Sequence, residues 1–170
     1  MAIEDHPLIV KSIAWDNEAQ TQAFAQALAK RLLGSAPGRN ALIQLHGDLG
    51  AGKTTFARHL LKGMGVQGRV KSPTYAVVEP YTVAASPASG DALTIWHFDF
   101  YRFDDPNEWE EAGFRDIFAS PGLKLIEWPE KAGHHLPPAD LDIHIEVLAN
   151  EVRAVLLTAH TDAAAAALPP

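Results

Sequence analysis

The stretch "GDLGAGKTT", from Gly47 to Thr55, matches the pattern G-x-x-x-x-G-K-[ST]. In such a loop successive backbone N–H groups surround an anion, and glycine permits backbone angles that a side chain would obstruct. Lys53 is expected to reach the β- and γ-phosphates of a nucleotide, and the Thr54 hydroxyl to ligate Mg²⁺. A chance match in a chain of this length has a probability of roughly 0.5%. The stretch therefore predicts a phosphate-binding loop.

The segments on either side of this loop fit that interpretation. "ALIQLH" (41–46) is a short apolar run typical of a buried strand. "KTTFARHLLKGM" (53–64) places its apolar residues on one helical face and ends near Gly63 and Gly65, which are suitable stops. The alternative is a glycine-rich turn that caps a helix and happens to carry Lys-Thr. The order of strand, loop and helix favours phosphate binding over that alternative.

Composition limits the class of protein. The chain has 170 residues, of which 47% are apolar and 21% charged, as expected for one globular domain with a sizeable core. It has no cysteine, so disulfides, thiolate metal sites and a thiol nucleophile are excluded. The net charge of −7 disfavours direct binding to nucleic acid, because the phosphate backbone repels an acidic surface. In a nucleic-acid pathway, a partner protein would make most of that contact.

The sequence also bears on location. No apolar run approaches the ~20 residues needed to span a bilayer, so we expect no contact with a membrane. The segment "MAIEDHPLIVKS" (1–12) has early acids and no basic stretch before a long apolar core, so we expect no signal peptide. The cytoplasm is the expected compartment.

Periodicity predicts the remaining elements. An amphipathic helix is expected over 16–33 with Asp16 as N-cap, and a short helix over 104–113 with Asp105 as N-cap. We expect strands at 76–83, 93–101, 123–128, 141–148 and 152–159, the last of them closing the sheet. The first two are separated by the small-residue loop 84–91, which favours an antiparallel hairpin. We find no internal repeat and no domain boundary, so residues 1–160 are expected to form one domain, followed by an alanine- and proline-rich tail over 161–170 that is expected to fray.

Two acids stand where apolar strands end. "LKLIE" runs into Glu127 and "IWHFD" runs into Asp99. A carboxylate at the end of a buried strand is costly unless it is paired, and a metal ion is one partner that satisfies it. Hydrolysis near a phosphate loop needs such a group, and a second one to orient water. The alternative for each acid is an exposed position or a pair with Arg102 or a lysine. Two such acids in one chain favour roles beside metal and water.

Other candidate residues leave alternatives open. "KSPTY" (71–75) follows the loop-helix, where switch segments lie, so Thr74 could supply a hydroxyl and Lys71 a charge, although a simple Ser-Pro turn is the alternative. His97 and Asp99 share a strand face, but without a third ligand nearby a zinc site is disfavoured. His134 and its neighbour His135 are expected in a solvated loop. The tryptophans at 96, 109 and 128 are expected in the core, although the last, beside the acid at 127, could instead approach the nucleotide.

The type of nucleotide is indicated by sequence motifs that the chain lacks. The chain has no Asn-Lys-x-Asp run of the kind that reads guanine in Ras-like GTPases, so ATP is the expected nucleotide. Its seven arginines include no paired set in a lid-like loop, which argues against a small-molecule kinase. A kinase remains the second hypothesis, and a module that senses ATP but barely cleaves it is the third.

Four motifs in order, "GDLGAGKTTFAR", "VKSPTYAVVEPY", "HFDFYR" and "LIEWPEK", closely resemble those of the bacterial TsaE (YjeE) family. The resemblance covers about residues 43–147. It implies the ATPase component of the machinery that makes threonylcarbamoyladenosine in tRNA. It also implies an α/β fold, a three-layer P-loop NTPase domain with a mixed, mostly parallel central sheet. The loop 84–91 and the alanine-rich tail lie outside the four motifs.

The resemblance also implies roles for individual residues. ATP and Mg²⁺ would bind on the loop from 47 to 55, with Lys53 at the reacting phosphates, and Thr54 and Glu127 would hold the metal directly or through water. Asp99 matches the family's catalytic acid, Trp128 its active-site tryptophan and Thr74 its switch segment. The full expected binding set is Gly47, Asp48, Leu49, Gly50, Ala51, Gly52, Lys53, Thr54, Thr55, Thr74 and Trp128, with Asp99 and Glu127 beside the metal.

Partners follow from the same resemblance. They would be TsaD and TsaB, with tRNA contacted indirectly through their complex. TsaD would transfer the threonylcarbamoyl group, and ATP hydrolysis by this chain would drive or reset the complex.

Overall fold

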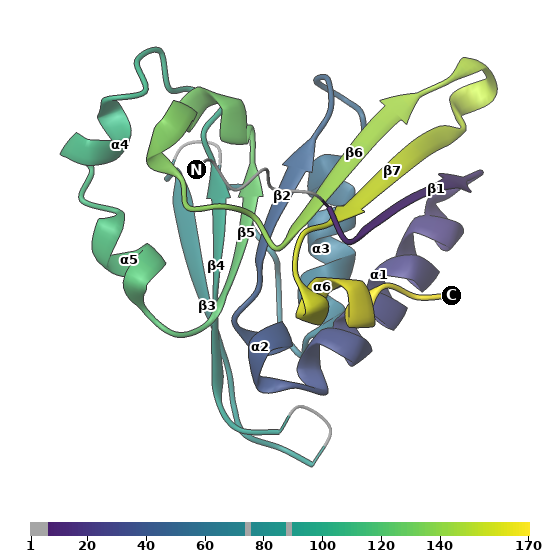
Figure 1. Cartoon of the computed structure of the whole chain (residues 1–170), viewed down its shortest axis with the longest axis horizontal. Coiled ribbons are helices and arrows are strands. Elements are labelled where there is room, and N and C mark those ends of the chain that lie inside the picture. Colours follow the sequence, from purple (N-terminus) through teal and green to yellow (C-terminus); the bar gives the residue numbers. More distant parts are fainter. Residues whose placement is uncertain (1–6, 74–75, 88–89) are drawn as a thin grey trace.

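The computed structural model describes residues 7–73, 76–87 and 90–170. In this part of the chain seven strands form one sheet in the order β1-β7-β6-β2-β5-β4-β3 (Figure 1). β6, β2, β5 and β4 are parallel, whereas β7 and β3 run antiparallel to their neighbours. β1 is antiparallel to β7, so five of the seven strands point the same way and the sheet is mixed but mostly parallel. The strands are β1 (Ile9–Trp15), β2 (Leu42–His46), β3 (Val78–Val83), β4 (Leu93–Asp99), β5 (Leu123–Glu127), β6 (Leu141–Val147) and β7 (Arg153–Ala159).

Helices cover the two faces of the sheet unequally (Figure 1). α1 and α3 pack on one face, whereas α4, α5 and the 3₁₀ segment η1 lie over the other face near β4 and β5. The three layers expected from the sequence are therefore present across β2, β5 and β4. No described helix covers the second face of β6, β7 and β1. The helices are α1 (Glu18–Leu33), α2 (Ala36–Arg39), α3 (Lys53–Gly63), α4 (Glu108–Glu111), α5 (Arg115–Ala119) and α6 (Asp162–Ala167), with 3₁₀ segments η1 (Pro129–His135) and η2 (Ala149–Glu151).

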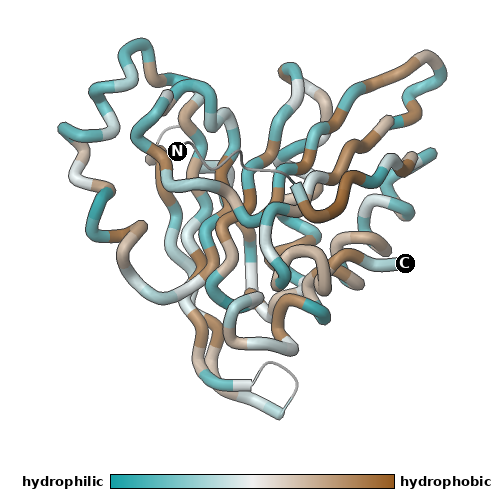
Figure 2. Tube along the Cα trace, in the orientation of Figure 1, coloured by the Kyte–Doolittle hydropathy of each residue, from teal (hydrophilic) through white to brown (hydrophobic). Residues whose placement is uncertain are grey.

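Two apolar cores stabilise these layers. The larger lies between the sheet and the α1–α3 layer, and Figure 2 shows hydrophobic residues running along the strands that feed it. The smaller core is aromatic. Its centre is the fully buried Phe98, whose ring stacks on Phe118 at 4.9 Å and meets Phe114 edge-on at 5.3 Å between centroids. Because Phe98 immediately precedes Asp99, this second core fixes the end of β4 that carries the acid.

Most of the expected elements are confirmed. The strand before the phosphate loop, the helix after it and the strand that ends at Glu127 have nearly the expected bounds. β3 and β4 form the expected antiparallel pair, and Pro80 is tolerated because β3 lies at the edge of the sheet. In β6 the residues at 141, 143 and 145 are buried and those at 142, 144 and 146 are more exposed, as its alternation indicates, and the pattern ends at the exposed Val147.

Two helices begin later than expected. α1 is capped by Asn17, whose extended backbone (φ −158°, ψ 174°) lets its side chain accept the Gln20 N–H at 3.0 Å. Asp16 instead donates its backbone N–H to the Gln20 side chain. α4 begins at Glu108, because the Asp105 carboxylate accepts the Asn107 N–H at 2.9 Å and forms a turn there rather than a cap.

The two ends of the chain also differ from expectation. β1 was not predicted, and it pairs outside β7, so β7 does not close the sheet. The tail is not frayed, because residues 162–167 form α6, capped by the Thr161 hydroxyl. The small side chains of Ala164 and Ala167 are buried in the main core, and the Arg31 guanidinium on α1 donates to the Ala166 carbonyl at 3.3 Å. Within the described ranges no helix has the length and apolar character needed to cross a bilayer.

Candidate functional site

The phosphate loop connects the end of β2 to the start of α3. Gly47, Gly50 and Gly52 have φ values of +152°, +81° and +108°, which favour glycine. A Cβ on Gly47 would also lie 2.5 Å from the Ile145 carbonyl oxygen, so a side chain there would collide with β6. Gly52 precedes the first helical residue and makes no side-chain cap, so the N–H groups at the start of this 11-residue helix face outward. A helix start of this kind, with its positive dipole end, suits an anion.

Lys53 lies over this loop. Its ammonium donates to the carbonyls of Gly47 and Asp48, the latter at 3.0 Å, and lies 4.0 Å from the centroid of the Trp128 ring. Burial lowers the pKa of Lys53, although Glu127 and three other nearby acids oppose that shift. The sequence thus places one cation, partly removed from water, beside the expected phosphate position.

Glu127 lies opposite Thr54 in the same cavity. It is 1% exposed at the end of β5, where its Oε1 accepts the Thr54 hydroxyl at 2.8 Å. Its Oε2 lies 2.7 Å from Nε2 of His97, a fully buried residue on β4. Both carboxylate oxygens are therefore held, one by a residue of α3 and one by a residue of the neighbouring strand.

Asp99 lies beside Glu127. The parallel register of β4 and β5 pairs these two residues directly, and Asp99 is 4% exposed. Its Oδ1 accepts the Tyr101 N–H at 2.9 Å. The two acids thus reach the cavity from separate strands, at the carboxyl ends where ligands bind in open α/β sheets.

Trp128 has a backbone conformation that is rare for a bulky residue. Its φ of +56° and ψ of +49° are left-handed, at a cost of about 1–2 kcal/mol. The strand turns sharply there, which places the indole against the Lys53 ammonium and 5.0 Å from the Tyr101 ring. Strain of this kind is concentrated at functional sites, so it supports a functional position for Trp128.

One cavity of about 330 Å³ brings most of the expected residues together. It is lined by Leu49, Gly50, Ala51, Gly52, Lys53, Thr54, Thr55, Asp99, Glu127 and Trp128, together with Tyr101 and Arg153. Gly47 and Asp48 contact Lys53 through their carbonyls but line a neighbouring groove. Thr74 lies outside the described residues. The sequence disfavours zinc at His97 and Asp99, and in the structure the Nε2 of His97 contacts Glu127.

Magnesium, unlike zinc, needs oxygen ligands. This ion binds in nucleotide sites through one or two carboxylates and a hydroxyl, and phosphate oxygens and water complete its shell. Thr54 Oγ1 and Glu127 Oε1 are 2.8 Å apart, and Asp99 lies on the adjacent strand. Three hard oxygen donors at the edge of one cavity fit Mg²⁺.

Sequence reasoning missed Arg153. This residue begins β7, where its Nε donates to the Ala51 carbonyl at 3.4 Å and its Nη1 to the Glu151 carbonyl at 2.5 Å. It lines the phosphate cavity and also a second one of about 360 Å³. That second cavity adjoins the loop and lies between the start of α1 and the β6–β7 turn, with Trp15, Asn17 and Asn150 in its walls. No local motif marks Arg153, since it reaches the loop only through the order of the strands.

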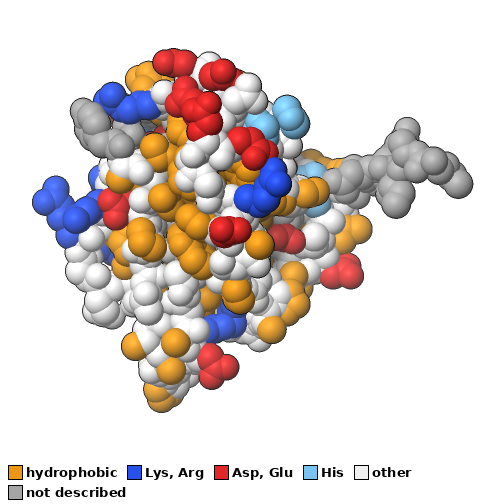
Figure 3. Space-filling view, turned by 90° about the vertical axis from the view of Figure 1, so that its left-hand side faces the viewer, with side chains coloured by type: hydrophobic (Ala, Val, Ile, Leu, Met, Phe, Trp, Pro, Cys, Tyr) orange, Lys and Arg blue, Asp and Glu red, His pale blue; other side chains and the backbone are white. Residues whose placement is uncertain are grey.

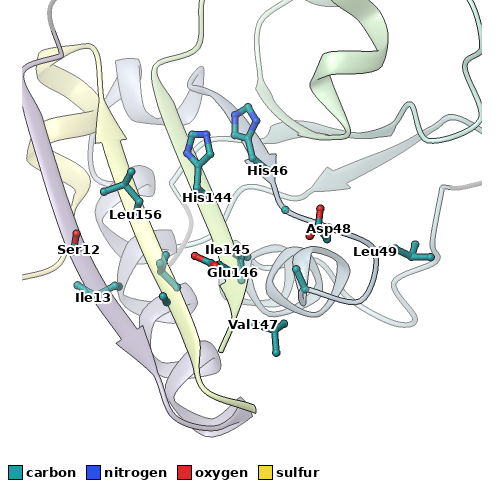
Figure 4. A pocket seen from close by; sticks show the side chains of 14 residues that line it. Ser12, Ile13, His46, Asp48, Leu49, His144, Ile145, Glu146, Val147 and Leu156 are labelled. Carbon is teal, nitrogen blue, oxygen red and sulfur yellow. The ribbon is translucent and has the colours of Figure 1, made fainter. Parts of the chain in front are cut away.

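A larger groove of about 720 Å³ lies on the other side of the loop, along β1, β7 and β6 (Figure 4). In it the rings of His46 and His144 stack 4.1 Å apart. Behind them Asp142 accepts from His46 at 2.6 Å and from His160 at 2.8 Å. Burial raises the pKa of Asp142, but the hydrogen bonds and charges of the two histidines outweigh burial and lower it. The groove contains none of the residues at positions 53, 54, 99 and 127, so its size does not make it the reaction site.

Comparison with known proteins agrees with this geometry. A family model described as "Threonylcarbamoyl adenosine biosynthesis protein TsaE" matches residues 15–155. The chain belongs to the TsaE family. The TsaE family takes part in the biosynthesis of threonylcarbamoyladenosine in tRNA.

Individual TsaE proteins are similar over most of their length. The tRNA threonylcarbamoyladenosine biosynthesis protein TsaE of Haemophilus influenzae is 42% identical over 139 residues, covering 82% of this chain and 83% of that protein. The TsaE protein of Bacillus subtilis is 32% identical over 152 residues, covering 88% and 87%. The crystal structure of YdiB from Bacillus subtilis superposes with a TM-score of 0.69 at 26% identity, covering 94% of this chain and 93% of that one.

Proposed function

We propose that this protein is a Mg²⁺-dependent ATPase that serves threonylcarbamoyladenosine formation in tRNA. The observation that carries the proposal is the meeting of Lys53 and Thr54 with Glu127 and Asp99 in one cavity. Membership of the TsaE family supplies the pathway. A site for simple nucleotide binding needs only the loop, whereas two buried acids facing it supply what hydrolysis also requires.

The loop and Lys53 would bind the phosphates. The first residues of α3 line the cavity and no side chain caps their N–H groups, and an ammonium has three donors. Two of the Lys53 donors are directed to the carbonyls of Gly47 and Asp48, and the third can reach a phosphate oxygen. Because Lys53 is buried, its charge would act on the terminal phosphates with little screening by water.

The two acids would divide the remaining work. Thr54 Oγ1 and Glu127 Oε1 would hold Mg²⁺, directly or through water, and the ion when bound would neutralise charge that develops on the phosphates. Asp99, which lines the cavity, would orient the attacking water. Trp128 would exclude bulk water from the Lys53 side of the cavity. The nucleoside would occupy the adjoining cavity beside Asn17, with Arg153 between the two cavities.

Turnover is proposed to depend on TsaD and TsaB, in the cytoplasm. The charge of the chain supports contact with tRNA through those partners rather than directly. Figure 3 shows acidic side chains gathered on the face that carries α4, where Asp104, Asp105, Glu110 and Glu111 are exposed. The net charge is −7. Such a face would repel a nucleic-acid backbone, so a partner protein is better placed to hold the tRNA.

The proposal is tested by measuring phosphate release from γ-labelled ATP. The protein alone is expected to hydrolyse ATP slowly, and TsaD, TsaB and tRNA together to stimulate it strongly. Lys53→Ala serves as the inactive control, because it removes the cation aimed at the terminal phosphates. Label transferred to a metabolite would indicate a small-molecule kinase instead, and tight ATP binding without release under any condition would indicate a sensor module.

A further inference from the structure

His97 is buried behind the proposed metal site. It lies on β4 two residues before Asp99, is 0% exposed, and has its Nε2 2.7 Å from Glu127 Oε2. Its direct register partner on β5 is Leu125, so the Glu127 side chain leans back along the strand to meet it. Such diagonal pairs lie within reach of long side chains. The contact is therefore specific to the rotamer that Glu127 adopts.

We infer that His97 is the positioning residue for Glu127, which turns one carboxylate oxygen, Oε1, toward Thr54 and the metal position. This inference rests on the proposed ATPase function. A glutamate side chain has three rotatable bonds, and a free one would sample many orientations at the end of β5. Here the imidazole N–H holds one oxygen and leaves the other directed at the Thr54 hydroxyl, 2.8 Å away.

The remaining contacts of His97 support this assignment. Among the described residues its Nδ1 has no hydrogen-bond partner, so the polar interaction of the ring is directed at Glu127. A carboxylate only accepts hydrogen bonds, so His97 must donate through Nε2–H. Carboxylates that ligate metals are commonly held by such outer partners, and losing the partner typically costs 10–100-fold in metal affinity or activity.

A purely structural role for His97 makes a different prediction. Removing a donor from a buried carboxylate lowers stability in either case. Only a positioning role makes the binding of Mg²⁺ depend on where the replacement donor lies. Binding of ATP without Mg²⁺ relies on the loop and Lys53, so it is expected to change little.

Two amide substitutions separate the roles. The Gln Nε2 is three bonds from Cβ, as is the His Nε2, so His97→Gln can still donate to Glu127. His97→Asn carries the same amide one bond shorter, at the place of Nδ1, and cannot reach. The measurement is the affinity for ATP by isothermal titration with Mg²⁺ and with EDTA, alongside the thermal unfolding midpoint of each variant.

We expect His97→Asn to lose about 10–100-fold of the Mg²⁺-dependent gain in ATP affinity. His97→Gln should retain most of it at a similar unfolding midpoint. An equal Mg²⁺ gain in the parent and His97→Asn would overturn the inference, and so would equal losses in both variants. If the parent itself shows no Mg²⁺ gain, the proposed function fails and the inference with it.

A measurement on the parent protein covers the case in which both variants unfold. Nitrogen NMR of the imidazoles is expected to show Nε2 of His97 protonated and hydrogen-bonded, and still so after MgATP is added. Loss of that bond on binding would contradict a positioning role.

Discussion

Replacing Gly47 by alanine should disable the phosphate loop without disrupting the sheet. The added Cβ would lie 2.5 Å from the Ile145 carbonyl oxygen and 3.0 Å from the Ala51 Cβ. Neither neighbour can move easily, since Ile145 belongs to β6, which is paired on both sides, and Ala51 is buried in the main core. The loop therefore has to move away from β6.

The size of that movement follows from the contacts. Ordinary contact begins at 3.4 Å, so the 2.5 Å approach requires a shift of about 0.9 Å. A misplacement of about 1 Å can cost on the order of 100-fold in rate. Gly50 provides the control, because its φ of +81° is also positive and favours glycine, but nothing lies within 4 Å of a Cβ there. Both variants carry backbone strain of about 1–3 kcal/mol, and only Gly47→Ala adds the collision.

The assay is phosphate release in the presence of TsaD and TsaB, with urea unfolding to confirm that both variants fold. We expect turnover to fall about 100-fold in Gly47→Ala and less than about tenfold in Gly50→Ala. Similar turnover in the two variants would refute the argument that close packing against β6 sets the loop.

Three further outcomes are expected. Asp142→Asn should have a lower free energy of unfolding than the parent at neutral pH. This difference should disappear as the pH falls below about 3.8, because an acid whose pKa is lowered in the folded state stabilises the fold only while it is ionised. Glu146→Gln, an exposed acid on the same strand, should show no such gap in urea unfolding at matched pH values. Phe98→Ala should cost about 3–5 kcal/mol of unfolding free energy and Phe98→Leu clearly less; equal losses would argue against the aromatic core. Arg153→Met should weaken ATP binding roughly tenfold in titration by removing a charged donor between the two cavities, and unchanged affinity would remove this residue from the site.

The sequence predicts the parts of the site that local patterns encode. The loop from 47 to 55 is recognisable from its glycine spacing between a strand and a helix. Glu127 and Asp99 stand out because each ends an apolar strand, and the parallel register of β4 and β5 then makes them neighbours. The loop and the two strand ends depend on residues close together in the chain, so the sequence is enough to predict them, whereas the pairing of the two acids is seen only in the strand register.

Features set by strand order are not encoded in this local way. Arg153 reaches the loop carbonyl of Ala51 across 102 positions in the chain, and His97 reaches Glu127 across 30. No periodicity encodes either contact. β1 was missed because its first two residues, Ile9 and Val10, are both apolar and both exposed. They break the alternation of apolar and polar residues that is typical of a half-buried strand. The tail forms α6 because its small alanine side chains pack close to α1 in the main core. Composition alone does not predict that packing.

The proposal depends on Asp99 and Glu127 acting on a nucleotide bound by the loop. The most direct measurement is phosphate release by Asp99→Ala and by Glu127→Ala, each beside the parent, with TsaD and TsaB present and ATP binding measured in parallel. Both variants are expected to lose at least about 100-fold in turnover while retaining measurable ATP binding. Turnover equal to that of the parent in both would contradict the assignment of these two acids and the ATPase site built on them.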